Sequence, residues 1–191
     1  ENVIPHVGGP LMDYVMNKRL QPRLGNRSLL HAPWGVYRTT GEDYWVAITV
    51  TSDAQWLALC NTIGQPDLAN DPRFVTLQNR LANRDVLDAI VTEWTCQHDR
   101  FEVMHLLQDA GIPAGPVLGG KDLAVSEQLA ATDFFVNLHK EAVGTHPYPG
   151  IAIRMNKTPG KRRSAAPNLG QHNHEILENL MGLSLEDVQR L

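Results

Sequence analysis

The chain has 191 residues, of which 42% are hydrophobic and 20% charged, and its formal net charge is −4. This composition is typical of a globular protein that buries its own core, and it excludes a largely disordered chain. A negative net charge gives no general attraction to nucleic acid or to an anionic membrane. The longest apolar stretches, such as Tyr44 to Val50, are too short to span a bilayer. We therefore expect no nucleic acid and no membrane among the partners.

Cysteine usage and the first residue add two expectations. Cys60 and Cys96 are too few for a disulfide framework, and we expect reduced structural thiols among apolar neighbours in a cytoplasmic protein. The chain begins with Glu1 rather than Met, and no signal-like segment follows. We therefore expect it to be part of a longer protein.

The N-terminal region predicts a helix followed by a linker. Leu11, Tyr14 and Val15 follow a helical spacing, and residues 20–33 are a loop punctuated by proline, glycine and asparagine. We assign residues 1–35 to an incomplete N-terminal helix and linker.

Three strands are predicted in the next part of the chain. Val36–Thr39 and Tyr44–Val50 alternate in polarity and are joined by a short polar connection containing a glycine, which is typical of an antiparallel hairpin. A third strand is expected at Ala114–Leu118. Residues 36–118 therefore predict a small α+β domain rather than a doubly wound parallel sheet.

Three helices are predicted between the second and third strands: one over residues 52–63, one within about residues 78–97 and one over residues 99–110. Capping boxes mark the start of the first helix at Ser52 and of the third at Asp99.

The remaining residues predict a less compact region. Residues 134–138 and 151–155 alternate in polarity and are expected as strands, with a proline-rich turn at His146–Gly150 between them. Residues 158–170 lack an apolar period and are expected to run over a surface. Two short helices are predicted at the C-terminal end.

No motif for nucleotide binding, for a serine nucleophile or for a metal ion is present. The close pair His172 and His174 points in different directions at the start of a helix, so we expect no metal site.

Two groups of charged residues stand out. Asp85 and Asp88 with Arg80 and Arg84 are interpreted as charge pairs on a solvated helix face. A basic cluster near the C-terminal end is interpreted as a solvated surface segment, with phosphate attraction as the alternative. This cluster comprises Arg154, Lys157, Lys161, Arg162 and Arg163.

The loop before the hairpin, residues 24–35, mixes turn-forming residues with large side chains. Such a loop often covers a ligand, but a plain linker is equally compatible with these residues. The residues alone indicate a soluble α+β protein without a self-contained active site.

Several short pieces of this sequence, in order, resemble the class III CoA-transferases, the group of carnitine dehydratase-like and bile-acid-inducible-protein-like enzymes. These pieces are Arg23–Arg27, Ala32–Tyr37, Trp45–Ile48, Asn70–Phe74, Asn83–Arg84, Gly111–Val117, Ala166–His172, Glu175–Leu177 and Gly182–Ser184. The resemblance implies an enzyme that transfers CoA between carboxylic acids, with acyl-CoA and carboxylate substrates and neither a metal nor a covalently bound cofactor. It also implies an aspartate nucleophile that forms an enzyme–CoA thioester. That aspartate belongs to the N-terminal half of the family pattern, so we expect no catalytic residue in this chain.

The same resemblance implies the fold of the whole enzyme. The family has a Rossmann-like large domain made from both chain ends and a small α+β domain inserted between them, and two subunits interlock as a homodimer. Residues 36–118 then correspond to the small domain. Residues 119–191 correspond to the return linker and the C-terminal part of an incomplete large domain.

The loop before the hairpin is expected near the active site in this family. The candidate substrate-binding residues are Gly25, Asn26, Leu29, Leu30, His31 and Trp34. Some relatives carry a glycine-rich segment where this chain has Leu29-Leu30-His31, and glycine alone would give that segment close backbone approach and mobility. This departure is compatible with a bulkier or more apolar acyl group, or with the racemase, dehydratase and isomerase branches of the family. A non-catalytic binding or interaction module is the further alternative.

Overall fold

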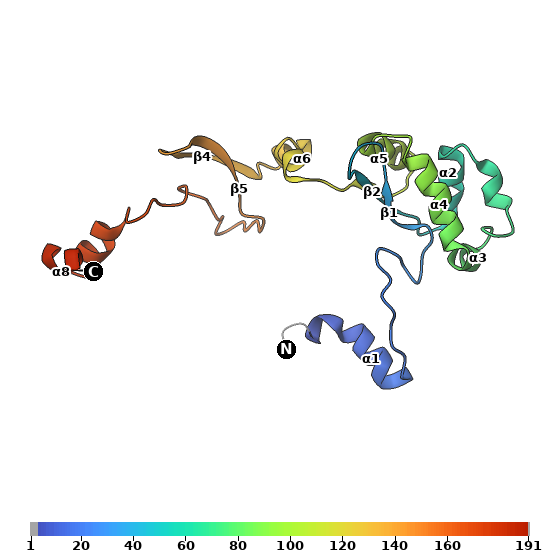
Figure 1. The fold of residues 1–191 in the computed structure, drawn as a ribbon, viewed down its shortest axis with the longest axis horizontal. Coiled ribbons are helices and arrows are strands. Elements are labelled where there is room, and N and C mark those ends of the chain that lie inside the picture. The colour runs from blue at the N-terminus through green and yellow to red at the C-terminus, as the bar shows by residue number, and fades with distance from the viewer. Residues whose placement is uncertain (1–3, 191) are drawn as a thin grey trace. The chain divides into compact units, whose positions relative to one another are not determined.

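The computed structural model describes residues 4–190 (Figure 1). Its internal contacts divide the chain into two units, Glu1–Val117 and Leu118–Leu191.

The first unit begins with helical structure. A 3-10 turn, η1 (Ile4–Val7), leads into helix α1 (Gly8–Asn17), which ends at Lys18 in the left-handed conformation. The predicted N-terminal helix is confirmed. Its apolar side chains are largely in solvent, since Val15 is 60% exposed.

A three-stranded antiparallel sheet lies at the centre of the first unit. The strands β1 (Trp34–Arg38), β2 (Trp45–Thr49) and β3 (Ala114–Pro116) are arranged in the order β1-β2-β3. Val36 lies opposite Ala47, and Ala47 lies opposite Gly115. The predicted hairpin and third strand are therefore confirmed.

Helices cover this sheet and complete the core of the first unit (Figure 1). They are α2 (Asp53–Thr62), the 3-10 helix η2 (Pro66–Asn70), α3 (Leu77–Ala82), α4 (Arg84–Thr95) and α5 (Arg100–Asp109). Helix α4 contacts β1, and α5 contacts β2 and β3. Alternate residues of β2 enter the core, which also contains aromatic and aliphatic side chains from the helices. The fully enclosed members include Val46, Ile48, Leu59, Phe74, Leu87, Val91, Val103 and Leu107.

The predicted helix starts are confirmed with one change of detail. The Ser52 hydroxyl accepts a hydrogen bond from the Gln55 amide at 3.2 Å. The Gln55 side chain does not complete the box at Ser52 but accepts instead from the Thr51 amide at 2.8 Å. At the third helix, the Asp99 carboxylate accepts from the Phe101 amide at 2.8 Å.

The helix predicted within residues 78–97 is confirmed as α4, and a separate short helix, α3, precedes it with a break at Asn83. The backbone of Asn83 is not helical, with φ −107° and ψ 26°. Its side-chain amide donates to the carbonyls of Asn79 at 2.9 Å and Arg73 at 3.1 Å. A short amide side chain of this kind competes with the helical hydrogen bonds and favours a break.

The second unit contains two short helices, a two-stranded hairpin and two C-terminal helical segments. They are α6 (Gly120–Ala124), α7 (Glu127–Ala131), β4 (Phe135–Lys140), β5 (Gly144–Pro149), the π-helix η3 (His174–Leu180) and α8 (Leu185–Arg190). The strand predicted at 134–138 is confirmed as β4.

The strand predicted at residues 151–155 is wrong, and so is the turn at His146–Gly150. Residues 146–149 lie in β5, and the turn comes earlier, just before Gly144 with φ 80°. In a two-stranded sheet every strand is an edge strand, so prolines without a backbone N–H are tolerated in β5.

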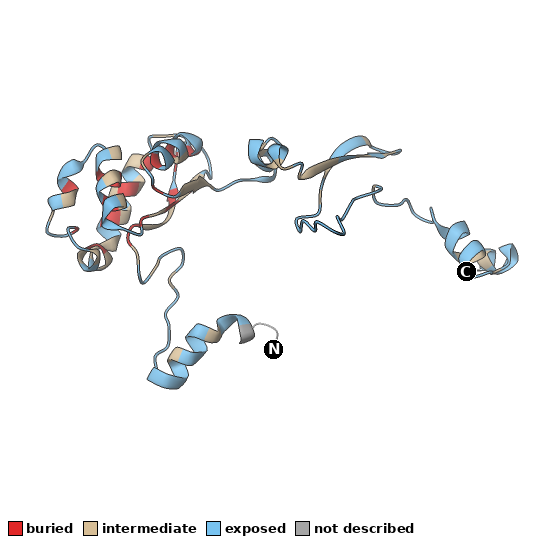
Figure 2. Ribbon diagram, turned by 180° about the vertical axis from the view of Figure 1, so that it is seen from behind, coloured by how far each residue is buried: buried red, intermediate tan, exposed pale blue. Residues whose placement is uncertain are grey.

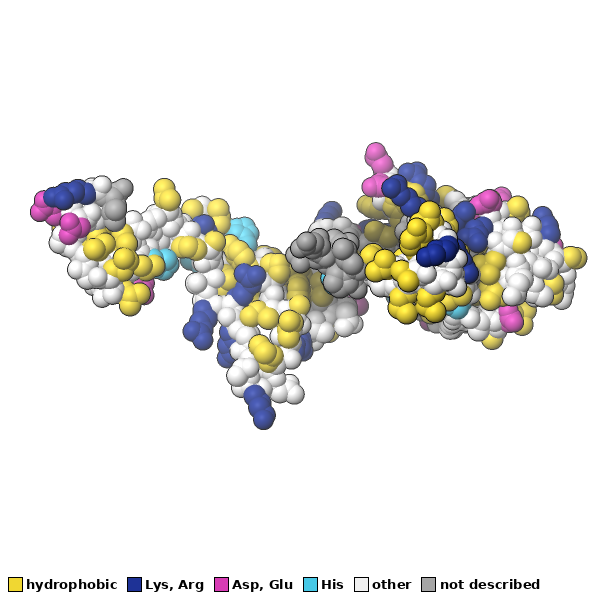
Figure 3. Space-filling view, turned by 90° about the horizontal axis from the view of Figure 1, so that it is seen from below, with side chains coloured by type: hydrophobic (Ala, Val, Ile, Leu, Met, Phe, Trp, Pro, Cys, Tyr) yellow, Lys and Arg dark blue, Asp and Glu magenta, His cyan; other side chains and the backbone are white. Residues whose placement is uncertain are grey.

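Where burial is described, the buried residues all lie in the first unit, as Figure 2 shows. Among described residues 118–190, none is buried. Apolar side chains such as Ile153, 72% exposed, and Leu180, 81% exposed, lie on the surface of the second unit. In Figure 3 hydrophobic side chains and Lys or Arg side chains are both visible on this unit. None of the helices described has the length and hydropathy needed to cross a bilayer.

Candidate functional site

The candidate site is the segment Leu24–Pro33, which connects the N-terminal residues to β1. Gly25, with φ 60°, and Asn26 form its first turn, which the Arg27 amide closes by donating to the Leu24 carbonyl at 3.1 Å. The Leu30 amide donates to the Ser28 hydroxyl at 3.0 Å. The segment therefore has its own local hydrogen bonds, which a plain flexible linker would lack.

A buried arginine holds the C-terminal end of this segment. Arg80 on α3 donates from Nε to the Ala32 carbonyl and from Nη1 to the Phe74 carbonyl, both at 3.1 Å. Its Nη2 donates to the Asp53 carboxylate at 2.7 Å, and its guanidinium lies 5.3 Å from the centre of the Trp56 ring. The side chain is only 2% exposed, so these acceptors replace the water that a buried cation loses.

A second arginine holds the N-terminal end of the segment. Arg27 Nη2 lies 2.6 Å from Asp85 Oδ1 and 2.8 Å from Asp88 Oδ2, both on α4. The hydrogen bond with Asp85, together with the charge of Asp88, raises the pKa of Arg27. The other oxygen of Asp88 accepts from the Tyr37 hydroxyl at 3.0 Å, which connects the segment to β1.

These contacts correct the interpretation of the charged residues on α3 and α4. Asp85 and Asp88 do not pair with Arg80 or Arg84, and Arg80 does not lie on a solvated face. Arg84 donates to the Leu81 carbonyl at 3.1 Å within its own region. Helical spacing identifies only which residues are neighbours along a helix. The ion-pair partners of Arg80, Asp85 and Asp88 come instead from distant segments of the chain.

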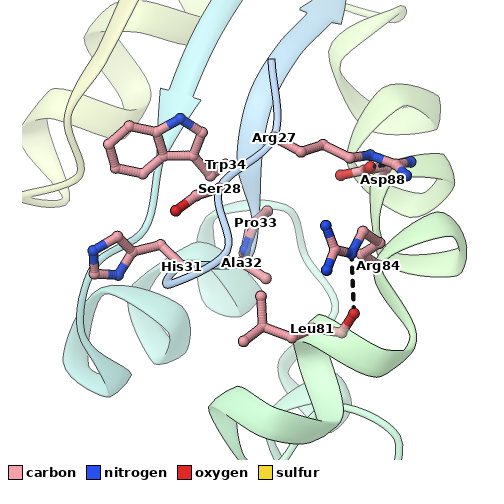
Figure 4. Close-up of a pocket in the computed structure, with 9 residues that line it drawn as sticks. All are labelled: Arg27, Ser28, His31, Ala32, Pro33, Trp34, Leu81, Arg84 and Asp88. Atoms are coloured by element: carbon pink, nitrogen blue, oxygen red, sulfur yellow. Dashed lines mark hydrogen bonds and ion pairs between the residues drawn. The ribbon is translucent and has the colours of Figure 1, made fainter. Parts of the chain in front are cut away.

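His31 and Trp34 are brought together by the structure. Their rings stack with centroids 5.5 Å apart and an interplanar angle of 19° (Figure 4). The His31 Nδ1 atom is enclosed and has no hydrogen-bond partner among the described residues. By contrast, Leu29 is 49% exposed and Leu30 is 71% exposed. The segment thus presents an apolar outer surface beside a stacked aromatic pair.

A small cavity of about 10 Å³ lies between this segment and helices α3 and α4 (Figure 4). His31 and Trp34 line it, together with Arg27 and Asp88, whereas the other four candidate residues do not. A cavity of this size holds about one water molecule. This cavity therefore has no room for a ligand larger than a water molecule.

The basic cluster predicted near the C-terminal end lies along a larger hollow of about 840 Å³ within the second unit. Arg154, Lys161 and Arg162 line it beside Phe134 and Ile151. Arg154 also donates to the Thr132 carbonyl. This member of the cluster is therefore held by a hydrogen bond within the second unit.

The remaining candidate groups show ordinary structural roles. Cys60 is buried, and burial raises the pKa of its thiol to about 11. Cys96 is the C-cap residue of α4 and is exposed. The expectation that it lies among apolar neighbours is therefore wrong. His172 and His174 each pair with a glutamate on the same helical segment. Within residues 4–190, no three metal-ligating side chains are grouped to hold an ion.

Comparison with known proteins gives one consistent family. The chain matches CoA-transferase family III over residues 1–173. The succinyl-CoA–D-citramalate CoA-transferase of Chloroflexus aurantiacus is 29% identical over 191 residues, covering 100% of this chain and 47% of that protein. The formyl-CoA:oxalate CoA-transferase of Streptomyces coelicolor is 29% identical over 171 residues, covering 89% of this chain and 42% of that protein.

A solved structure extends the match to three dimensions. A CAIB/BAIF family protein from Brucella suis superposes with a TM-score of 0.80 at 27% identity, covering 94% of this chain and 45% of that one. This likeness agrees with the predicted α+β fold class. The chain spans less than half the length of these relatives.

Proposed function

This chain belongs to CoA-transferase family III, and from that membership we propose that the protein transfers CoA from an acyl-CoA thioester to a free carboxylate. The observation that carries the proposal is the family match over residues 1–173, together with relatives named as CoA-transferases along most of the chain. Coenzyme A enters this reaction as part of the substrate.

The proposed reaction uses a carboxylate nucleophile. An aspartate attacks the thioester carbonyl, expels CoA as a thiolate and forms a mixed anhydride with the acyl group. The CoA thiolate then attacks the aspartyl carbonyl, which releases the donor as a free carboxylate and leaves an enzyme–CoA thioester. The acceptor carboxylate attacks this thioester to form a second anhydride, and the expelled CoA thiolate attacks the acceptor's acyl carbonyl, which releases the new acyl-CoA and regenerates the aspartate. We assign this aspartate to a part of the protein outside this chain. The carboxylates of the candidate segment's anchor, Asp85 and Asp88, are engaged by Arg27 and are not proposed as nucleophiles.

We assign the segment Leu24–Pro33 and Trp34 to the edge of the substrate site. The exposed side chains Leu29 and Leu30 favour contact with the apolar part of an acyl group, because burying them on binding is favourable. Gly25 and Asn26 form the turn that starts the segment, and His31 supports it by stacking on Trp34.

The organisation of the whole protein is part of the same proposal. Residues 36–118 form the small domain, and residues 119–191 return to a Rossmann-like large domain. The protein is proposed to be an interlocked homodimer, and the free thiols Cys60 and Cys96 favour a cytoplasmic location. Apolar residues are exposed on α1 and on the second unit. This exposure supports the proposal that both regions pack against other parts of the whole protein.

The experiment is a transfer assay on the purified product of the native gene. Succinyl-CoA is incubated with malate, citramalate or oxalate, and all CoA esters are separated by chromatography. We expect a new CoA ester to form as succinyl-CoA disappears, with total thioester conserved. Conversion of the starting acyl-CoA to an isomeric or dehydrated CoA ester would favour another branch of the family, whereas release of free CoA alone would contradict transfer. No change in any ester would favour a non-catalytic module.

The role of the leucines is tested in the same assay. Leu29→Gly combined with Leu30→Gly should change the ratio of kcat/KM between a small and a large carboxylate acceptor. Leu20→Gly is the matched control, because this leucine is 80% exposed and lies outside the segment. An unchanged ratio in the double variant would remove these leucines from the substrate site.

A further inference from the structure

Two arginine contacts attach opposite ends of the segment Leu24–Pro33 to helices α3 and α4. Arg27 reaches out from the segment to the α4 carboxylates at 2.6 and 2.8 Å. Arg80 reaches from α3 to the Ala32 carbonyl at 3.1 Å. Figure 4 shows the Arg27 side chain directed to Asp88 on the helix beside the segment. The segment is therefore attached at both ends to one rigid support.

The Arg80 site requires the geometry of a guanidinium group. Its three nitrogens are directed at three different acceptors, the carbonyls of Ala32 and Phe74 and the carboxylate of Asp53. These acceptors belong to the segment, to the loop before α3 and to the start of α2. A lysine ammonium is a point charge and cannot present donors in this planar arrangement, so lysine would keep the charge but lose the geometry.

Between the two anchors the segment has local support from the Leu30–Ser28 hydrogen bond and the His31–Trp34 stack, but its leucine side chains have little packing support. Leu29 and Leu30 are 49% and 71% exposed, so they gain little from packing against the core. The position of this apolar surface therefore depends on the two arginines. A loop held in one conformation before the ligand arrives avoids an ordering cost on binding.

We propose that Arg80 and Arg27 are positioning residues that present the Leu29–Leu30 surface of this segment to the acyl group during CoA transfer. This inference rests on the proposed function. Neither arginine needs to touch the substrate, because each acts through the backbone that it holds. A displacement of about 1 Å in such a support lowers the rate by up to about 100-fold.

The first test measures the segment itself, independently of any activity. Amide hydrogen exchange over residues 24–33 is compared in the native gene product and in two variants, Arg80→Lys and Arg27→Gln. Arg73→Lys is the matched control, since the Arg73 guanidinium pairs with its near neighbour Asp71 and lies over the Phe74 ring, and neither partner belongs to the segment. We expect the amides of the segment to exchange at least about tenfold faster in both variants than in the native gene product. In the control, we expect their exchange rates to be unchanged. Unchanged exchange in both variants overturns the anchoring role.

The second test measures transfer kinetics in the same proteins. We expect Arg80→Lys to raise KM for the acceptor and to lower kcat/KM by about 10- to 100-fold, while its core amides keep their native exchange. Faster exchange in the segment with unchanged kinetics overturns the positioning role. If Arg80→Lys does not fold, Arg27→Gln decides the matter, because Arg27 is 40% exposed and lies outside the core.

The two tests separate failure of this inference from failure of the proposed function. If the native gene product transfers no CoA, the proposed function fails and with it the positioning role in CoA transfer, whereas the exchange result still decides the anchoring role. If transfer occurs and both variants keep native kinetics, only the inference fails.

Discussion

Removing the Tyr37 hydroxyl tests the connection between the sheet, helix α4 and the candidate segment. Tyr37 is 3% exposed, and its hydroxyl donates to Asp88, whose other oxygen accepts from Arg27. The substitution Tyr37→Phe keeps the ring, so it opens no large cavity in the core. The change therefore isolates one hydrogen bond to a carboxylate.

The size of the effect follows from the environment of this bond. A hydrogen bond to a charged group contributes about 1.5–3 kcal/mol to the free energy of unfolding. Asp88 keeps its contact with Arg27 at 2.8 Å in the variant, which favours the lower end of that range. A loss of about 1.5 kcal/mol lowers Tm by roughly 3–6 °C for a chain of this size.

The assay is urea and thermal unfolding of the chain, followed by circular dichroism. Tyr44→Phe is the matched control, because Tyr44 is 43% exposed and its ring faces the Arg100 guanidinium, a contact that phenylalanine keeps. We expect a change below about 0.5 kcal/mol for this control. A Tyr37→Phe variant as stable as the unmodified chain would refute the proposed network.

The same residue predicts a dependence of stability on alkaline pH. Burial, reinforced by Asp88, raises the pKa of Tyr37 in the folded chain. Above the ordinary tyrosine pKa of about 10, the unfolded chain releases this proton while the folded chain retains it, so stability falls as pH rises. Tyr37→Phe should remove this part of the alkaline loss.

Three further predictions concern other parts of the first unit. At pH 8 exposed Cys96 should react with a thiol reagent much faster than Cys60, whose pKa is raised to about 11 by burial, and two equally fast thiols would contradict this. Leu87→Ala should lower the free energy of unfolding by about 2–5 kcal/mol in urea titrations, because Leu87 is fully buried; a loss below about 1 kcal/mol would disagree. Gly41→Ala should lower stability by about 1–2 kcal/mol, since φ is +104° there and a methyl group would lie 2.4 Å from a tyrosine ring carbon. Gly115→Ala is its control, with open space around the added carbon, and equal losses in both variants would argue against strain at the turn.

Short-range patterns in the sequence correctly predicted most of the first unit. The alternation over Tyr44–Val50 predicted the strand β2, in which Val46 and Ile48 are fully buried. The capping residues Ser52 and Asp99 marked helix starts that the structure confirms. Strand alternation and helix caps involve residues only a few positions apart in the sequence. The interactions that stabilise them are local, so the sequence alone is enough to predict them.

The order of short motifs predicted the family, which the comparison over residues 1–173 confirms. The same motifs drew attention to the segment before β1 but gave no account of what holds it. The six candidate residues remain a proposal for substrate contact, and only His31 and Trp34 among them line the small cavity.

Only the tertiary structure decided which charged groups meet. Arg80 and Asp53 are 27 positions apart, and Tyr37 and Asp88 are 51 apart, so no helical spacing relates them. The tertiary structure also placed β5 over the predicted turn, because pairing with β4 outweighed the turn preference of its prolines. By itself the sequence determined the fold class, the helix starts and the family, since local pattern and motif order encode these. The partners of Arg27 and Arg80 depend on how distant segments pack, and that is decided when the core closes.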